Sequence, residues 1–202
     1  MNDAKAASRE TLKLLAEALN NRNFETLVVE TGEEARRLVF ERIPEGAEVH
    51  SGKSKTLEDI GVLKELQESG RYKFLRSIYL KMDREKQARE IRKLVSAPDV
   101  MVGSANAVTQ DGILVATSAG GGQIGPYASG GGKVIFVIGN QKIVPDLDSA
   151  FRRIRELVLP WENARVREAK GFDSFVGKTL VYEREWVKGR VTVILVNEAL
   201  GV

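Results

Sequence analysis

The lack of cysteine and the presence of a single histidine limit the chemistry that is open to this chain. None of its 202 residues is a cysteine, which excludes disulfides, thiolate nucleophiles and cysteine-ligated iron–sulfur clusters within the chain. His50 is the only histidine, so neither a histidine-rich metal site nor a Ser-His-Asp triad is expected. We therefore predict that the chain binds no metal and carries no cofactor of its own.

Long hydrophobic runs are also missing. No segment reaches the roughly 18 apolar residues that a membrane-spanning helix needs. The N-terminal segment carries acidic residues where a signal peptide has an apolar core. We expect a cytoplasmic protein that does not bind membranes.

The charge of the chain is nearly balanced, with 31 basic and 28 acidic residues. Its most basic stretch, DREKQAREIRK (83–93), is interrupted by acidic residues. That pattern favours a solvated helix face, since a nucleic-acid surface more often has a basic stripe with interleaved aromatics. We expect no nucleic-acid partner.

Short apolar runs alternate with amphipathic patterns along most of the chain. The runs predict strands at 24–29, 47–50, 73–75, 100–102, 113–117, 134–138, 180–182 and 191–196. A first helix is expected over about 3–20, and further helices begin after the capping residues Thr31, Thr56, Asp83 and Asp146. Residues 160–178 look irregular. The alternation favours one domain, 1–202, with a largely parallel sheet between helix layers; the assignment is least detailed over 166–202.

Polar loops follow several of the predicted strands. Ligands of parallel sheets bind beyond the carboxyl ends of the strands, so the loops 51–56, 103–111, 118–125 and 139–142 could converge on one site. The candidate ligand-binding residues in these loops are Gly52, Lys53, Ser54, Thr56, Ser104, Asn106, Thr109, Gly121, Gly122, Gln123, Asn140 and Lys142.

Two glycine-containing loops look like nucleotide-binding motifs, but neither match is good. The loop before Lys53 lacks the first glycine of a P-loop because position 47 is alanine. It is either an anion-binding loop or an ordinary strand-to-helix turn. The segment GGGQIG (120–125) fits a dinucleotide fingerprint, but glycines at 130–132 would end the next helix early, and position 140 is not acidic. The strip 119–132 is either a mobile lid or a phosphate cradle.

Asp111 is the only carboxylate inside a candidate site loop. It is therefore the best candidate for a catalytic base. The sequence Gln110-Asp111-Gly112 is also typical of a tight turn, and we favour the turn.

Four blocks of the sequence together resemble the LUD, or lactate-utilisation, domain family. They are SGKSKTLEDIG (51–61), GSANAVTQDGILV (103–115), GGKVIFVIGNQKIV (131–144) and DLDSAFRRIRE (146–156) with the following LPWENAR. The resemblance covers roughly residues 5–165, and VTVILVNEALG (191–201) is similar to the end of such proteins. It implies a three-layer α/β/α sandwich with a mainly parallel sheet, similar to the NagB/RpiA/CoA-transferase-like fold.

The resemblance also implies a bacterial or archaeal cytoplasmic protein, and some family members help to oxidise L-lactate to pyruvate as partners of iron–sulfur subunits. This chain departs from the family pattern at three places. Members often have an acid where this chain has Gln110, and an Asn-Arg pair where it has Gly122 and Gln123. Many end in a cysteine-rich segment that this sequence lacks. These departures weaken the case for redox chemistry and for a complete anion clamp in this chain.

Two hypotheses of different classes follow. In the first, the chain is an accessory or regulatory subunit that binds iron–sulfur lactate-oxidation subunits. In the second, it is an enzyme of the isomerase or CoA-transferase type acting on an anionic small molecule. Asp111 would then be the base, and Lys53 or Lys142 would stabilise developing charge. A homo-oligomer is compatible with either hypothesis.

Overall fold

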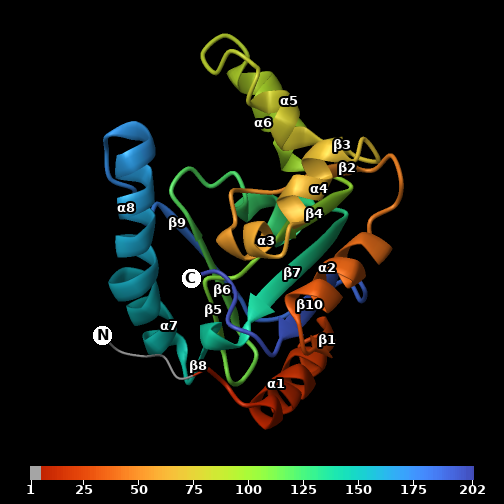
Figure 1. Ribbon diagram of the computed structural model, residues 1–202, viewed down its shortest axis with the longest axis vertical. Helices are drawn as coiled ribbons and strands as arrows, with labels where there is room; N and C mark the ends of the chain where they lie inside the picture. Colours follow the sequence, from red (N-terminus) through yellow and green to blue (C-terminus); the bar gives the residue numbers. More distant parts are fainter. Residues whose placement is uncertain (1–5) are drawn as a thin grey trace.

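A six-stranded parallel sheet forms the centre of the molecule. The computed structural model describes residues 6–202, and Figure 1 shows their arrangement. The strand order is β1-β10-β7-β4-β2-β3, and every neighbouring pair is parallel. The strands are β1 (Glu25–Val29), β2 (Glu48–His50), β3 (Lys73–Phe74), β4 (Val100–Gly103), β7 (Lys133–Gly139) and β10 (Val191–Val196).

A second, smaller sheet packs on one face of the first. Its order is β8-β5-β6-β9, with β5 and β8 parallel and the other two pairs antiparallel. The strands are β5 (Ala107–Thr109), β6 (Leu114–Ser118), β8 (Ile143–Val144) and β9 (Lys178–Tyr182). The sequence pattern did not indicate this sheet, because strand periodicity says nothing about which strands pair.

Helices cover both sheets. The α-helices are α1 (Arg9–Asn21), α2 (Gly32–Glu41), α3 (Lys55–Asp59), α4 (Val62–Glu68), α5 (Leu75–Tyr79), α6 (Ala88–Ser96), α7 (Leu147–Arg153) and α8 (Leu159–Lys170). Three one-turn segments complete the set: η1 (Pro126–Gly130), η2 (Asn140–Lys142) and η3 (Ile154–Val158). In Figure 1, α7 and α8 lie on one side of the molecule, and α5 and α6 project from the top.

The large sheet is buried on both faces. One face packs against α2, α3 and α4, with Val39 and Leu57 at the contact. The other face packs against α1, through Leu12 and Leu15, and against the small sheet. The outer face of the small sheet is covered in turn by α7 and η3. This arrangement confirms the predicted α/β sandwich with a mainly parallel sheet, to which the small sheet adds a layer.

Helix starts follow two of the four predicted capping residues. Thr31 and Asp146 cap α2 and α7 as predicted. The cap of α3 is Ser54, two residues before the predicted Thr56. The Thr56 hydroxyl points into the protein and bonds to Lys142. The helix α6 begins at Ala88, behind Gln87 and not behind the predicted cap Asp83, whose carboxylate accepts hydrogen bonds from the amides of Glu85 and Lys86 in the preceding turn. The first helix begins at Arg9, behind the cap Ser8; residues 3–5 of its predicted range lie outside the described residues.

The prediction of an irregular segment over 160–178 was wrong for its first half. Residues 147–170 run through α7, η3 and α8 without a break. Pro160 lies in the first turn of α8, directly after the wide π-turn η3. The missing amide hydrogen of a proline is tolerated at such a position.

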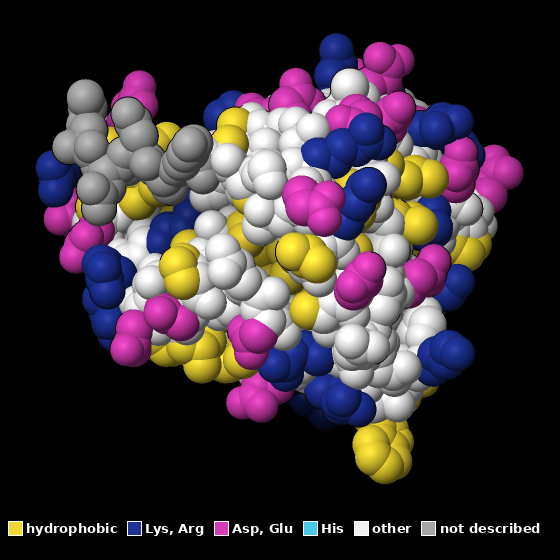
Figure 2. Space-filling view, turned by 90° about the horizontal axis from the view of Figure 1, so that it is seen from below, with side chains coloured by type: hydrophobic (Ala, Val, Ile, Leu, Met, Phe, Trp, Pro, Cys, Tyr) yellow, Lys and Arg dark blue, Asp and Glu magenta, His cyan; other side chains and the backbone are white. Residues whose placement is uncertain are grey.

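The surface carries charges of both signs. Figure 2 shows Lys and Arg side chains interspersed with Asp and Glu side chains over the face seen from below. Within residues 6–202, no helix is both long enough and apolar enough to span a lipid bilayer.

Tyr127 fixes how closely η1 approaches the end of β4. Its ring is buried and packs against Phe136 at 4.6 Å between centroids. A Cβ atom at Gly103 would overlap the Tyr127 hydroxyl, so position 103 has no room for a side chain.

We predict that Gly103→Ala lowers the free energy of unfolding by about 2 kcal/mol, because overpacking forces a buried ring to move. Urea denaturation followed by circular dichroism measures the change. Gly122→Ala is the matched control, since a Cβ atom at Gly122 meets nothing within 4 Å. Equal stability of the two variants would contradict the packing argument.

Candidate functional site

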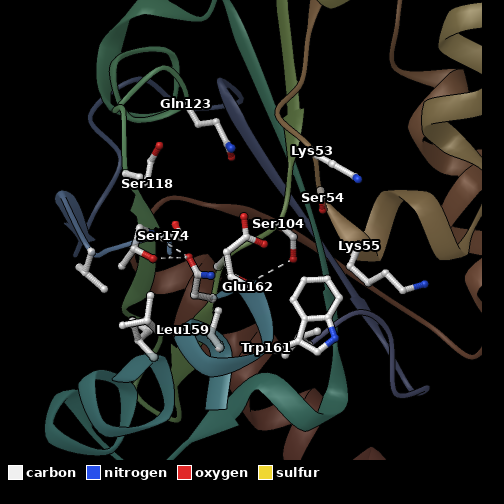
Figure 3. Close-up of a pocket in the computed structure, with 18 of the residues that line it drawn as sticks. Lys53, Ser54, Lys55, Ser104, Ser118, Gln123, Leu159, Trp161, Glu162 and Ser174 are labelled. Carbon is white, nitrogen blue, oxygen red and sulfur yellow. Dashed lines mark hydrogen bonds between the residues drawn. The ribbon is translucent and has the colours of Figure 1, made fainter. Parts of the chain in front are cut away.

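A cavity of about 280 Å³ lies where three neighbouring strands end. The strands β2, β4 and β7 are adjacent and parallel, so the loops that follow them meet at one edge of the sheet. The opposite wall comes from α8 and from the loop before β9. Figure 3 shows Ser118 and Ser174 on one side of this cavity, and Lys53 and Lys55 on the other.

Most of the loops predicted to converge do so. The predicted residues that line the cavity are Lys53, Ser54, Thr56, Ser104, Asn106, Gln123 and Lys142. Gly52, Gly121 and Gly122 lie next to lining residues in the chain but do not line the cavity themselves, and Thr109 and Asn140 are also absent from its wall.

Lys142 is buried at the floor of the cavity. It lies in η2, directly after β7, and its side chain is 4% exposed. The amine donates hydrogen bonds to Thr56 Oγ1 at 2.6 Å and to Ser104 Oγ at 3.0 Å. Burial, and then the positive charge of Arg153, lower the pKa of Lys142 from 10.5 to about 7.

No carboxylate pairs with this amine among residues 6–202. The nearby carboxylate of Asp59 acts on Lys142 only at a distance, and raises its pKa. Asp59 itself pairs with Lys55 and accepts a hydrogen bond from the amide of Gly201. A protonated Lys142 therefore has only two neutral hydroxyl groups as hydrogen-bond partners among the described residues.

A second cation, Arg153, is buried behind the cavity wall. It is 7% exposed, and burial lowers its pKa to about 10. Its Nη1 donates to the carbonyl of Asn106 at 2.8 Å, while Nε and Nη2 have no hydrogen-bond partner in the described residues. Buried cations are normally paired with acids. Two of them next to a cavity indicate a place for an anion.

Two further lysines stand at the mouth of the cavity. Figure 3 shows the side chains of Lys53 and Lys55 directed away from the other labelled residues. Both line the opening. Glu162 is the acid in the wall, and it is paired with Arg165 of the same helix. Lys55 is likewise paired, with Asp59, so Lys53 and Lys142 are the lining cations without an acidic partner among the described residues.

The sequence model of the LUD domain matches residues 12–196. The chain belongs to the LUD-domain family. The resemblance to the lactate-utilisation domain seen in the sequence blocks is thus confirmed.

Among solved structures, the LUD domain is similar to a DUF162 family protein from Deinococcus radiodurans. The TM-score is 0.50 at 11% identity, covering 95% of this chain and 99% of that chain. Ribose 5-phosphate isomerase A from Neisseria gonorrhoeae matches with a TM-score of 0.32 at 16% identity, covering 91% of this chain and 79% of that chain. No curated protein matches the sequence. At such identities the first likeness shows the fold alone.

The glycine-rich loop of this LUD domain closes against the loop after β2. A Cβ atom at Gly52 would overlap the side-chain amide of Gln123, so the glycine allows the two loops to touch. Gln123 in turn accepts a hydrogen bond from the Tyr127 hydroxyl at 3.2 Å. The strip 119–132 thus supplies part of the cavity wall, through Gly120 and Gln123, and then turns away in η1.

Asp111 does not line the cavity. Its carboxylate pairs with Arg22 at 2.7 Å and accepts a hydrogen bond from the Thr109 hydroxyl. Arg22 also donates to the Asp111 carbonyl. The pair joins the end of α1 to the turn between β5 and β6, and so matches the turn that the sequence favoured. In this geometry Asp111 is not positioned to act as a base in the cavity.

The wall formed by α8 and the loop before β9 was missed. It contributes Leu159, Trp161, Glu162, Ser174 and Phe175. One signal for this wall was present in the sequence, since LPWENAR belongs to the blocks that carry the family resemblance. Arg153 was missed because a basic residue on a helix is usually solvated.

His50 is the other buried titratable group of this region. It ends β2 with 3% exposure, its Nδ1 has no partner among the described residues, and its ring meets Tyr79 edge-on at 5.8 Å. Burial lowers the pKa of His50 from 6.5 to about 4, and the nearby Arg76 acts in the same direction.

We predict that His50 makes the protein less stable in acid. Between pH 6.5 and about 4 the unfolded chain binds a proton at this imidazole that the folded chain does not, so the free energy of unfolding falls as the pH falls through this window. The loss attributable to His50 is about 3 kcal/mol. Urea titrations at pH 7.5 and at intermediate values down to about pH 4.5 measure it. His50→Gln cannot titrate and should flatten this slope; an identical slope in the variant would refute the assignment.

Proposed function

We propose that this LUD domain binds a small carboxylate or phosphate anion in the cavity and acts on it there. The observation that carries the proposal is the buried amine of Lys142, which has two hydroxyl partners and no acid. A bound anion would supply the missing negative charge inside a region that water reaches poorly. The positive lining at the mouth would attract the same ligand.

The size of the cavity supports a small ligand. Its volume of about 280 Å³ lies near the lower end of the roughly 300 to 1,000 Å³ of small-molecule pockets. The hydroxyls of Ser54, Ser104 and Ser118 can bond to a carboxylate or phosphate, and Trp161 supplies an apolar surface. A short organic acid or a small phosphate ester fits this wall chemistry.

We predict that binding of such an anion is coupled to proton uptake. The anion favours the charged form of Lys142 and raises its pKa, so at pH 7 to 8 the complex takes up a proton and the affinity falls as the pH rises. Calorimetry with L-lactate, inorganic phosphate and a sugar phosphate, in buffers of different ionisation enthalpy, measures this uptake.

Lys142→Met should weaken the same binding about a hundredfold, equivalent to roughly 3 kcal/mol, because a charged hydrogen-bond donor is lost. Asp111→Ala is the control and should bind normally, since Asp111 lies outside the cavity. Tight binding to Lys142→Met, or no binding of any small anion to the wild type, would refute the proposal.

Family membership favours a second role, as an accessory subunit in lactate oxidation. In this role the LUD domain would bind iron–sulfur subunits that carry the redox centres. Because the chain has no cysteine, a cysteine-ligated cluster would have to belong to the partner. The two roles are compatible, since an accessory subunit can also hold the organic acid.

The accessory role predicts a stable complex with an iron–sulfur protein. An affinity-tagged chain is expressed in its own host, and its complexes are isolated by affinity and then size-exclusion chromatography. The isolated complex should contain near-stoichiometric iron and acid-labile sulfide. The tag alone is the control. A purified chain that contains neither element under anaerobic conditions would count against this role and leave the anion proposal untouched.

A further inference from the structure

The hydrogen bonds around Lys142 suit a neutral amine. A neutral amine has two N–H donors and one lone pair, whereas an ammonium has three donors. Thr56 Oγ1 and Ser104 Oγ satisfy two donors, and no third acceptor bonds to the nitrogen among the described residues. In the neutral state these two bonds use both N–H donors and leave the lone pair free, whereas in the protonated state they leave a third N–H free for an anion.

The surroundings of the amine suppress its protonation. Lys142 is the only buried lysine among residues 6–202, and its closest charged influences are the buried cation Arg153 and the already paired Asp59. Desolvation and a neighbouring cation are the two devices that activate lysine nucleophiles. At pH 7 a pKa of about 7 gives a neutral fraction about a thousandfold above that of an exposed lysine.

We propose that Lys142 is a covalent site, at which the amine condenses with the carbonyl carbon of a small aldehyde or ketone that also carries a carboxylate or phosphate. This inference deepens the proposed function and rests on it, because the anionic group of the substrate is the anion held by the positively charged cavity. Arg153, buried beside the cavity, and Lys53 at its mouth provide positive charge while Lys142 reacts.

The condensation balances without any further reactant. The nitrogen lone pair attacks the carbonyl carbon, and the carbonyl oxygen takes up a proton to give a carbinolamine. Loss of that oxygen as water forms the C=N bond, so one amine and one carbonyl give one imine and one water, with no oxidation or reduction. The hydroxyls of Thr56 and Ser104, which both contact the nitrogen, are positioned to relay the protons.

Reductive trapping tests the proposal. The wild-type protein is incubated near pH 7 with glyoxylate or with glyceraldehyde 3-phosphate, and the imine is reduced with cyanoborohydride. Trapping adds the mass of the probe less one oxygen atom, and peptide mapping locates it. We expect label at Lys142 to accumulate more than about tenfold faster than at the exposed Lys13, because far more of its amine is neutral.

The matched variants and probes sharpen the result. Lys142→Arg should lose the fast label, whereas Lys93→Arg should keep it. Glycolaldehyde, which has no charge, should label Lys142 more slowly than glyoxylate does. Comparison of the two anionic probes tells whether a carboxylate or a phosphate is preferred.

Label at Lys142 that is no faster than at Lys13 would overturn the proposal, and this comparison within one sample does not depend on the folding of any variant. If calorimetry shows that glyoxylate binds but Lys142 stays unlabelled, the covalent site is refuted and the anion site stands. If the probes neither bind nor label, both proposals fail.

Discussion

The parallel pairing of β7, β4 and β2 determines the position of every group at the floor of the cavity. Because the three strands run in one direction, the loops that follow them leave the sheet at the same edge. Lys142 follows β7, Ser104 follows β4, and Thr56 follows β2 by way of the loop 51–54. The two hydrogen bonds of the Lys142 amine therefore join the segments that follow three different strands. The rigidity of the site depends on the rigidity of the sheet.

The largely buried Arg190 and the buried Arg153 differ in how this LUD domain satisfies their hydrogen-bond donors. Arg190 pairs with Glu185 and donates five hydrogen bonds in all, to Glu185, Tyr182 and the carbonyls of Tyr127, Ala128 and Gly131. Arg153 makes one such bond and leaves Nε and Nη2 without a partner among the described residues. A cation whose donors are all hydrogen-bonded stabilises the fold, whereas a buried cation with unbonded donors costs free energy. Such a cost is typical of a site built for a ligand.

The sequence predicted what local patterns can carry. Apolar runs located the strands except the short β5 and β8. Thr31 and Asp146 marked helix starts, and the polar loops after strands included Lys142 and Ser104. Properties that depend on distant contacts were not predictable. The Thr56 hydroxyl bonds to Lys142 instead of capping α3, and the Asp111 carboxylate pairs with Arg22. Arg153 is buried by packing that sequence periodicity does not reveal. The lowered pKa of Lys142 likewise arises only when the fold removes water from its amine.

The place of β10 in the sheet has a consequence for biosynthesis. The edge strand β1 pairs only with β10, so that Glu25 lies beside Thr192. These two residues are far apart in the sequence, so the ribosome makes β1 long before β10. Pairing the two strands closes a long loop, and such loop closure slows folding. Until β10 emerges, β1 and the apolar side of α1 have no sheet to join, and an unpaired strand edge invites association with other chains. During synthesis the edge of β1 therefore stays unpaired until β10 has been made.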